Sequence, residues 1–357
     1  MSETVAPPSE EKLPADQLRS FGTRVLRAVG MPDEDAAITA DAMVWADLRG
    51  LPAHGIAFKL PQVVRRIKAG GTSAEGRLEL VRETPGISVY DAHDAWGQVA
   101  AAKGMKLAVA KARDAGAGLV LVRNITSAAA LGYFPWLAIR ERMIGIAICN
   151  GPALQAPLGG TKKVLGNLAH AIGVPALSSA PIIFDSATTV VSTGQLDVMH
   201  ERGQPAPAGA VLNEKGEPTL NPMDWLKGSL LPAGGHRGYG LALMFEILTG
   251  VLAGGQKLAP HVGGPSAYGE PQGVSLFLLA IDPAGIMPFE KFGARVDQVV
   301  QEIRSSPPSG GHERVYLPGE RSSILMAWQS LEDVGIPLLA AKVVELKELG
   351  AELDVAW

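Results

Sequence analysis

The chain has 357 residues, of which 47 % are hydrophobic and 19 % are charged, and its formal net charge at pH 7 is -4. This length exceeds one typical domain of about 100–200 residues, so we expect more than one domain. Lys and Arg form no long basic run, which argues against a protein that binds nucleic acid. No apolar run reaches the ~18 residues of a membrane span, and the first residues are acidic and Pro-rich where a signal peptide needs a basic start. We therefore expect a soluble protein without a membrane partner, located in the cytoplasm.

The single cysteine supports this location. Cys149 cannot form a disulfide within the chain, which suits a reducing compartment. It follows the apolar residues Ile146, Ala147 and Ile148. Because burial raises the pKa of a thiol, we expect a structural cysteine and not a nucleophile.

Hydrophobic periodicity predicts helices first and an alternation of strands and helices later. Residues 1–12 are polar and contain Pro, and we expect them to be disordered. The predicted elements up to residue 149 are helices at 15–29, 32–48 and 60–67, a strand at 87–90, a helix at 99–115, a strand at 119–122, a helix at 128–142 and a strand at 144–149. Pro135 should break or kink the helix at 128–142.

The second half of the chain has longer loops. A Gly/Pro-rich loop is predicted at 151–166 and a polar loop at 199–235. The predicted elements are extended segments at 171–175 and 182–184, an apolar helix at 240–252, a strand at 274–281, and helices at 289–303 and 336–349. The pattern indicates a mixed α+β fold.

The usual dinucleotide-binding motif, G-x-G-x-x-G after a strand, is absent. Its nearest counterpart, Gly116-Ala117-Gly118, precedes a strand instead of following one. A Rossmann domain is therefore not expected. No P-loop, H-E-x-x-H or cysteine zinc pattern occurs either, and the seven histidines are dispersed, so no metal is expected.

A histidine in a loop after the second predicted helix is the first candidate for chemistry. His54 lies near the end of the segment 46–55, between two glycine-marked turns. Imidazole titrates near neutrality, so a loop histidine beside a bound carbonyl can exchange the proton that accompanies hydride transfer. The alternative is a plain surface or capping histidine.

Three further segments have the composition of ligand sites. Phe184 to Thr189 follows a buried strand, where short polar side chains can meet a ribose or a phosphate; the alternative is a simple turn. The segment 234–240 combines glycines, Arg237 and the start of a helix, which suits a phosphate; the alternative is helix capping. Pro318-Gly319-Glu320 is a turn that means little alone.

In order and spacing, these segments resemble the type-2 malate/L-lactate dehydrogenase family. That family also includes ureidoglycolate dehydrogenase, sulfolactate dehydrogenase, 2,3-diketogulonate reductase and the cyclic-imine reductases acting on piperideine-2-carboxylate. The resemblance covers roughly residues 13–350 and includes GQVAAAKGMKLAVAKARDAG, IGIAICNGPALQAPLGG, FDSAT, GGHRGYGLALMFEILTG and PGE. The chain is a divergent member on this view.

The resemblance implies a fold unlike Rossmann. A mostly helical domain, residues 13–78 plus 255–357, would be built from both chain ends around a central α/β cofactor-binding domain, residues 79–254. It also implies NAD or NADP as cofactor, a small-molecule substrate and a homodimer. The family's acid–base histidine falls on His54. The positions matching its cofactor contacts are Ile182, Ile183, Phe184, Asp185, Ser186, Ala187, His236, Arg237, Gly238, Pro318, Gly319 and Glu320.

The chain departs from the family's pattern on the substrate side. Phe58, with Lys59 adjacent, stands where the family has an arginine suited to a carboxylate, and Ser127 replaces a second histidine. His170 is an alternative replacement for that histidine. Ala53 stands for a serine, and a segment that is usually Gly-Thr-Asn-Pro reads Gly166-Asn167-Leu168-Ala169. The candidate substrate-binding residues are Arg49, Lys59 and Asn150.

Our interpretation is hydride transfer between a nicotinamide cofactor and a small 2-oxo or 2-hydroxy acid, with His54 as proton donor and acceptor. Asp185 would either orient His54 or bind the cofactor, and Ser127 would hydrogen-bond the substrate or the nicotinamide amide. A cyclic-imine (C=N) reductase of the same family is the alternative. A non-catalytic nicotinamide-binding scaffold is the alternative from another class.

Overall fold

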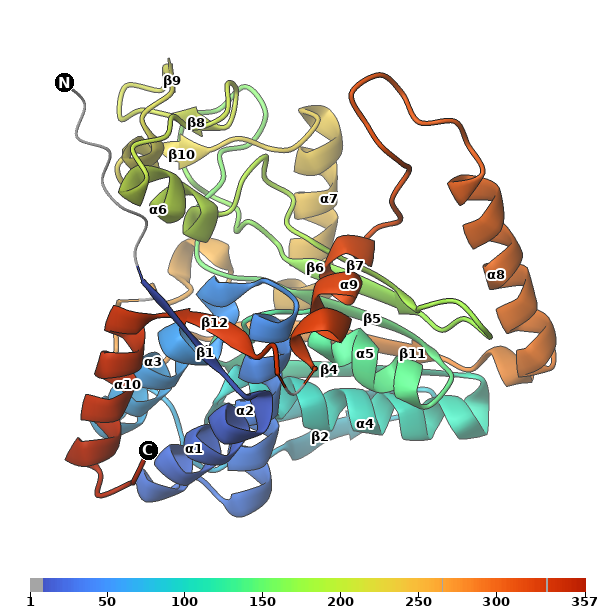
Figure 1. The fold of residues 1–357 in the computed structure, drawn as a ribbon, viewed down its shortest axis with the longest axis horizontal. Coiled ribbons are helices and arrows are strands. Elements are labelled where there is room, and N and C mark those ends of the chain that lie inside the picture. Colours follow the sequence, from blue (N-terminus) through green and yellow to red (C-terminus); the bar gives the residue numbers. More distant parts are fainter. Residues whose placement is uncertain (1–8, 265, 332) are drawn as a thin grey trace.

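A seven-stranded mixed sheet forms the centre of the protein (Figure 1), in a computed structural model that describes residues 9–264, 266–331 and 333–357. The strand order is β2-β3-β4-β11-β5-β6-β7. The strands are β2 (Glu79–Glu83), β3 (Ile87–Ala95), β4 (Ala117–Ile125), β5 (Ile144–Cys149), β6 (His170–Val174), β7 (Ile182–Ser186) and β11 (Val274–Ile281). β3 and β4 are parallel, and every other neighbouring pair is antiparallel. This order confirms the expectation of a mixed, non-Rossmann fold.

Helices cover both faces of this sheet. Figure 1 shows α4 (Gly97–Ala115) and α5 (Tyr133–Arg140) below it and α7 (His236–Glu246) above it. α7 continues as one π-helical turn, η3 (Ile247–Val251). The face of α4 that meets the sheet is rich in alanine, and small side chains let helix and strands approach closely. At Gly104 a Cβ would stand 2.6 Å from a methyl group of Leu278 on β11.

Both ends of the chain build the helical layer beside the sheet. Its helices are α1 (Ala15–Ala28), α2 (Asp33–Leu48), α3 (Ile56–Ala69) and α10 (Ala340–Glu352). Their apolar stripes share one core, which includes Leu18, Phe21, Met43 and Leu346. The expected helices near 15–29 and 32–48 are therefore confirmed, and the third begins earlier than expected.

Two expectations about the chain ends are wrong. Residues 10–12, expected to be disordered, belong to β1 (Glu10–Leu13), which pairs with β12 (Ile336–Leu339). The first four residues of the helix expected at 336–349 form that second strand. Ile336 and Leu338 are buried and alternate with Pro337, which lacks the N–H that a helix interior needs. Residues 1–8 of the segment expected to be disordered lie outside the described residues.

The predicted domain boundary at residue 255 does not separate sheet from helices. β11 lies between β4 and β5, in the middle of the sheet, although it follows that boundary in sequence. The helix expected at 128–142 is also shorter, because α5 begins only at Tyr133. Pro135 thus falls in the first turn of α5, where no intrahelical N–H donor is required. The rest of the division into domains stays a prediction.

The segment expected as a polar loop at 199–235 contains a small folded unit. It holds the end of α6 (Thr193–Glu201) and a three-stranded sheet of β8 (Val211–Leu212), β9 (Pro218–Thr219) and β10 (Ser229–Leu230). Leu196, Val211 and Leu230 give this unit its own apolar core. The short 3-10 turns outside the main layers are η2 (Pro222–Leu226), η4 (Ala259–His261) and η5 (Pro283–Gly285).

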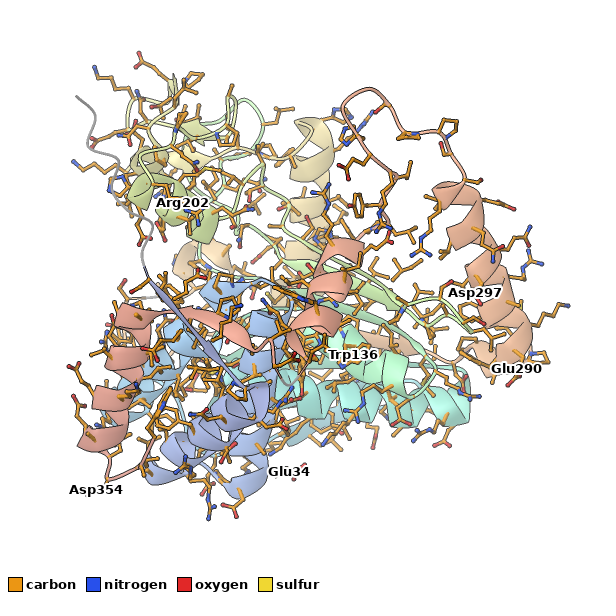
Figure 2. All side chains as sticks on the ribbon, in the orientation of Figure 1. Glu34, Trp136, Arg202, Glu290, Asp297 and Asp354 are labelled. Carbon is orange, nitrogen blue, oxygen red and sulfur yellow. The ribbon has the colours of Figure 1, made fainter. Side chains whose placement is uncertain are left out.

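Two helices near the C-terminus lie outside the sheet. α8 (Phe289–Arg304) runs along the edge of the molecule and carries Asp297 (Figure 2). The Asp297 carboxylate accepts hydrogen bonds from the N–H groups of Ser178 and Ser179. α9 (Glu320–Gln329) returns the chain to α2. In the described part of the chain, no helix combines the length and the apolar character needed to cross a membrane.

Candidate functional site

The loop between α2 and α3 holds His54 in a fixed position. His54 ends the 3-10 turn η1 (Pro52–His54), and its N–H donates to the Leu51 carbonyl at 2.9 Å. The Ile56 N–H donates to Oδ2 of the buried Asp47 at 2.8 Å. A Cβ on Gly55 would overlap Oδ1 of the same carboxylate. Asp47 therefore fixes the start of α3 and the loop that carries the histidine.

The His54 imidazole is half-buried and has unused hydrogen-bonding capacity. Its Nδ1 is shielded from solvent and has no hydrogen-bond partner among the described residues. Burial, and then the charge of Lys59, lowers the pKa of His54 to about 3. The ring is consequently neutral at pH 7 in the free protein, the form that accepts a proton.

A lysine stands beside His54, adjacent to Phe58, the position at which the family resemblance implies an arginine. Burial, and then the charge of Arg66, lowers the pKa of Lys59 to about 8, and its Nζ donates to Gln62 Oε1 at 3.1 Å. Phe58 instead packs against the helical core, with Lys342 Nζ at 5.1 Å from its ring centroid. Lys59 is thus a cation beside His54, and its predicted role in binding a substrate carboxylate stays a prediction.

Asp185 and Arg49 form a second charged group. Asp185 lies in β7, and its Oδ2 accepts the Gly132 N–H at 2.7 Å. Burial raises the pKa of Asp185 to about 6, although the Gly132 hydrogen bond and the nearby Arg49 oppose it. Arg49 is 5 % exposed, and burial lowers its pKa to about 10. No hydrogen bond joins Asp185 to His54 within the described chain, so the geometry does not favour the idea that Asp185 orients the histidine.

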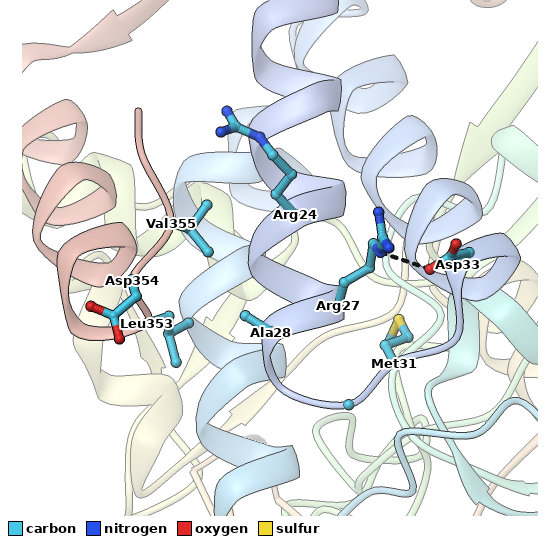
Figure 3. A pocket seen from close by; sticks show the side chains of 9 residues that line it. Arg24, Arg27, Ala28, Met31, Asp33, Leu353, Asp354 and Val355 are labelled. Atoms are coloured by element: carbon cyan, nitrogen blue, oxygen red, sulfur yellow. Dashed lines mark ion pairs between the residues drawn. The ribbon is translucent and has the colours of Figure 1, made fainter.

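Asp185 is open to solvent, yet burial is the main cause of its raised pKa. The two observations agree for a carboxylate that protein surrounds on most sides and water reaches from one side. His54 and Lys59 are in the same situation, since each is half-exposed and has a pKa shifted mainly by burial. These groups therefore lie in recessed surface. A separate hollow between the end of α1 and residues 353–355 (Figure 3) is lined by none of the predicted site residues.

The three predicted cofactor segments meet around β7. A Cβ on Gly319 would overlap the Ile183 carbonyl oxygen, so the turn 318–320 packs directly on this strand. Just after β7, the Thr188 carbonyl accepts the Ala233 N–H at 2.9 Å, and a Cβ on Gly238 would overlap the same oxygen. These two contacts hold the start of α7 against the segment that follows β7. The structure thus brings 182–187, 236–238 and 318–320 together, from three distant parts of the sequence.

The start of α7 has the open backbone that a phosphate needs. Gly235 has φ +62°, a conformation that favours glycine, and no atom lies within 4 Å of its Cβ position. His236 and Arg237 are exposed in the first turn of the helix. The N–H groups of Arg237 and Gly238 donate to the Gly234 and Ala233 carbonyls at 3.4 and 2.9 Å, so an anion at this helix end would meet the exposed side chains of the first turn and the positive end of the helix dipole.

Arg49 links these cofactor segments to the His54 loop. Its Nη2 donates to the Gly319 carbonyl at 3.3 Å and its Nη1 to Ser323 Oγ at 3.2 Å. Its guanidinium carbon lies 4.9 Å from the Trp45 ring centroid. Because its donors face α9 and its charge faces Asp185, Arg49 is a structural connection; the prediction that it binds substrate has no support in this geometry.

Two other predicted residues use their polar groups within the protein. Asn150 is buried, and its Oδ1 accepts the Ser275 N–H at 2.8 Å while its Nδ2 donates to Glu246 Oε1 at 3.5 Å. The side chain therefore joins β5 to β11 and α7, which does not fit a substrate-binding role. Ser127 Oγ accepts the Ala129 N–H at 3.3 Å, within its own loop.

The fold also explains the environments of three further side chains, those of Glu320, His170 and Cys149. Burial alone would raise the pKa of Glu320, but hydrogen bonds from the Leu317 N–H and from Arg304 outweigh it and lower that pKa. His170 lies on β6 and packs between the rings of Phe184 on β7 and Phe245 on α7. Burial lowers its pKa. Burial raises the pKa of the Cys149 thiol to about 12, which favours the neutral thiol over the nucleophilic thiolate. No group of three His, Cys, Asp or Glu side chains suited to a metal ion occurs in the part of the chain that the structure describes.

Asp47, which holds the His54 loop, is not among the residues predicted from the sequence. A signal for it exists. Asp47 is an acid in the last turn of α2, next to the negative end of the helix dipole, where a carboxylate is unfavourable. An acid in that position indicates a specific local role, which here is the hydrogen bond to the Ile56 N–H.

Known proteins are similar to this chain over almost its whole length. Residues 13–347 match the family model described as malate/L-lactate dehydrogenase. Malate dehydrogenase from Pyrococcus abyssi is 37 % identical over 352 residues, covering 96 % of this chain and 95 % of that protein. The Δ1-pyrroline-2-carboxylate/Δ1-piperideine-2-carboxylate reductase from Pseudomonas aeruginosa is 30 % identical, covering 87 % and 94 %. The solved structure of malate dehydrogenase from Pyrococcus horikoshii OT3 superposes with a TM-score of 0.88 at 34 % identity and 98 % coverage of both chains. The chain belongs to the malate/L-lactate dehydrogenase family.

Proposed function

We propose that the chain transfers a hydride between a nicotinamide cofactor, NAD or NADP, and a small 2-oxo or 2-hydroxy acid, and that His54 exchanges the proton. The observation that carries the proposal is the Nδ1 of His54, unpaired within the described residues, on a ring that the charge of Lys59 reaches. An imidazole with an unpaired nitrogen supplies proton transfer, and an ammonium group beside it supplies an anchor for a carboxylate.

The charge state of His54 fits this task. In the oxidation direction the neutral ring takes the hydroxyl proton, and at pH 7 the free protein holds the ring neutral. In the reduction direction the ring must first be protonated. A carboxylate bound at Lys59 favours that step, because a negative charge nearby and the neutralisation of Lys59 both raise the pKa of His54.

The residues around β7 fit a nicotinamide dinucleotide. A Cβ on Gly235 would occupy open space and not protein, so a phosphate has room to approach the start of α7 and the positive end of its dipole. We place the phosphates at His236, Arg237 and Gly238, and the remainder of the cofactor along 182–187 and the turn 318–320. A nicotinamide cofactor, when bound, supplies or accepts the hydride.

The direct test of this proposal is a thermal-shift titration of the full chain with NADH, NADPH, NAD and NADP. Ligands that bind the folded state raise the melting temperature by mass action. A clear shift with at least one form, followed by consumption of the reduced cofactor with a 2-oxo acid, is the expected result. No shift with any form at millimolar concentration would contradict the oxidoreductase proposal.

Replacing Lys59 should weaken substrate binding. Lys59→Gln removes the cation beside His54, and we expect KM for a 2-oxo acid to rise by about tenfold, the effect of one charge-assisted hydrogen bond. The affinity for the nicotinamide cofactor should stay the same. Steady-state kinetics would measure both, with Lys68→Gln, an exposed lysine later in α3, as the matched control. An unchanged KM would show that the carboxylate lies elsewhere.

A cyclic-imine substrate is the second candidate. A relative in the family carries the name of a cyclic-imine reductase. The Asn150 amide is engaged at both ends and Ser127 Oγ accepts the Ala129 N–H, so of these two residues only the Ser127 O–H can still donate to an oxygen at the reacting carbon. A parallel screen of 2-oxo acids and cyclic imines, following the absorbance of the reduced cofactor, distinguishes the two, and higher kcat/KM for imines would favour the second.

We propose further that the chain forms a homodimer through α7 and η3. The exposed side of this apolar helix carries Met244, 50 % exposed, Ile247, and Val251, 54 % exposed. Their spacing of three and four residues places them on one face. An exposed apolar surface of this kind is typical of a protein interface, and a second copy of the chain is the partner that the family resemblance implies.

The dimer proposal predicts a change of assembly. Met244→Glu with Val251→Glu should convert the dimer into a monomer, because two carboxylates would be buried unpaired at the interface. Light scattering on a gel-filtration column measures the mass. Ile286→Glu, at an exposed apolar residue outside this helix, is the control. A monomeric wild type would overturn the proposal.

We also place the protein in the cytoplasm. Its one cysteine cannot form a disulfide within the chain, which suits a reducing compartment. Fractionation of cells producing the full chain would test this, and recovery in an extracytoplasmic fraction would contradict it.

A further inference from the structure

Three arginines gather beside the turn that carries Gly319. They are Arg304 at the end of α8, Arg314 in the segment that follows, and Arg321 in the first turn of α9. The guanidinium carbons of Arg314 and Arg321 lie 4.3 and 4.4 Å from the ring centroid of Tyr316. One aromatic ring thus orders two guanidinium groups that would otherwise repel each other.

The carboxylate of Glu320 lies within this cluster, and both of its oxygens accept hydrogen bonds. Glu320 Oε1 accepts Arg304 at 2.8 Å and Arg314 at 3.1 Å, and Oε2 accepts the Leu317 N–H at 2.8 Å. Within the described part of the chain, Arg321 makes no ion pair. Three positive charges therefore face one negative charge, and the cluster has a cationic surplus that an anion would neutralise.

The arginine side chains remain accessible. The side chains of Arg304 and Arg314 are 43 % and 48 % exposed, while that of Glu320 is 7 % exposed. Arg321 and Tyr316 are also exposed. A ligand can consequently reach the donors of the guanidinium groups but not the carboxylate that holds two of them in place.

The cluster is continuous with the proposed cofactor site. The turn 318–320 packs on β7 through Gly319, whose carbonyl accepts Arg49. Arg321 follows this turn directly and lies at the start of α9, so the positive end of a helix dipole adds to its charge. An anionic group that extends from a dinucleotide lying along β7 would be close to these arginines.

We infer that Arg314 and Arg321, ordered by Tyr316, bind the phosphomonoester of a 2′-phosphorylated nicotinamide dinucleotide. This inference rests on the proposed function and narrows it to a preference for NADP over NAD. The chemistry is that of guanidinium groups, whose planar, forked donors match phosphate oxygens better than an ammonium does. A dinucleotide that lacks this phosphate would leave the cationic surplus unneutralised.

The test is a fluorescence titration of the full chain with NADPH and with NADH. We expect wild type to bind NADPH at least about tenfold more tightly than NADH, because each guanidinium–phosphate contact contributes a charge-assisted hydrogen bond. Arg321→Gln and Arg314→Gln should each weaken NADPH by about tenfold and leave NADH within about twofold. Arg295→Gln, at an exposed arginine on α8, is the control and should change neither constant. Arg321→Lys, which keeps the charge without the fork, should lose less than Arg321→Gln.

Two further readouts keep the result unambiguous. In wild type, 2′,5′-ADP should raise the melting temperature more than ADP does, and this difference should disappear in the Arg314→Gln/Arg321→Gln double variant. Equal wild-type affinity for NADPH and NADH, or equal weakening of both in the variants, would overturn the inference while the proposed function stands. Stabilisation by inorganic phosphate to the same extent as by 2′,5′-ADP would also overturn it, because the site would then recognise a free anion. Binding of neither dinucleotide would overturn the proposed function itself.

Discussion

His54→Ala is expected to lower turnover by about 100-fold or more, because a positioned general acid or base contributes that much to a proton transfer. The affinity for the nicotinamide cofactor should be nearly unchanged, since the cofactor segments lie around β7 and not in the His54 loop. Steady-state kinetics in both directions would give kcat, and a fluorescence titration would give the cofactor Kd.

A second histidine provides the control for this variant. His200→Ala removes an imidazole from the exposed end of α6 and should leave turnover and melting temperature unchanged. If His54→Ala retained wild-type turnover, His54 would not be the proton-exchanging group. A drop in cofactor affinity as large as the drop in kcat would instead assign His54 to cofactor binding.

Local sequence patterns predicted most of the elements, because the patterns act within a few residues. The helices near 15–29 and 32–48 and the strands at 144–149 and 274–281 were found from their periodicity. β12 was missed because an apolar run of four residues before a helix has the same composition as the helix. Only its pairing with β1, more than 300 residues away in sequence, makes it a strand.

Contacts between residues that are far apart in the sequence also build the candidate site. The Arg49 side chain contacts the Gly319 carbonyl and Ser323, which are separated from it by 270 and 274 positions. No local pattern reports such a contact. A local pattern can single out glycines and His54, whose backbone or titration properties are intrinsic, but it does not show that Arg49 and Asn150 make hydrogen bonds within the fold. The roles of all these residues stay predictions.

One helix, α3, carries both residues that matter for the predicted substrate side. Phe58 stands where the family resemblance implies an arginine, and the charge of the next residue, Lys59, reaches His54. A lysine binds a carboxylate as a point charge, without the bidentate geometry of an arginine. Under the proposed function, Lys59 would therefore attract an acid to His54 with less control over its orientation.

Gly55→Ala should inactivate the protein almost as completely as the loss of His54 itself. The backbone of Gly55 is extended, with φ -80° and ψ 177°, so the new methyl group causes no torsional strain. It would instead overlap the buried Asp47 carboxylate and displace the loop from the Ile56–Asp47 hydrogen bond. A shift of about 1 Å in a catalytic group can cost on the order of 100-fold in rate, and overpacking costs about 1–3 kcal/mol of stability. Kinetics and thermal unfolding would measure both, with Gly310→Ala as the matched control, since no atom lies within 4 Å of its Cβ position. Full activity in Gly55→Ala would mean that Asp47 does not hold the histidine in place, because the methyl group cannot be accommodated unless that contact is dispensable.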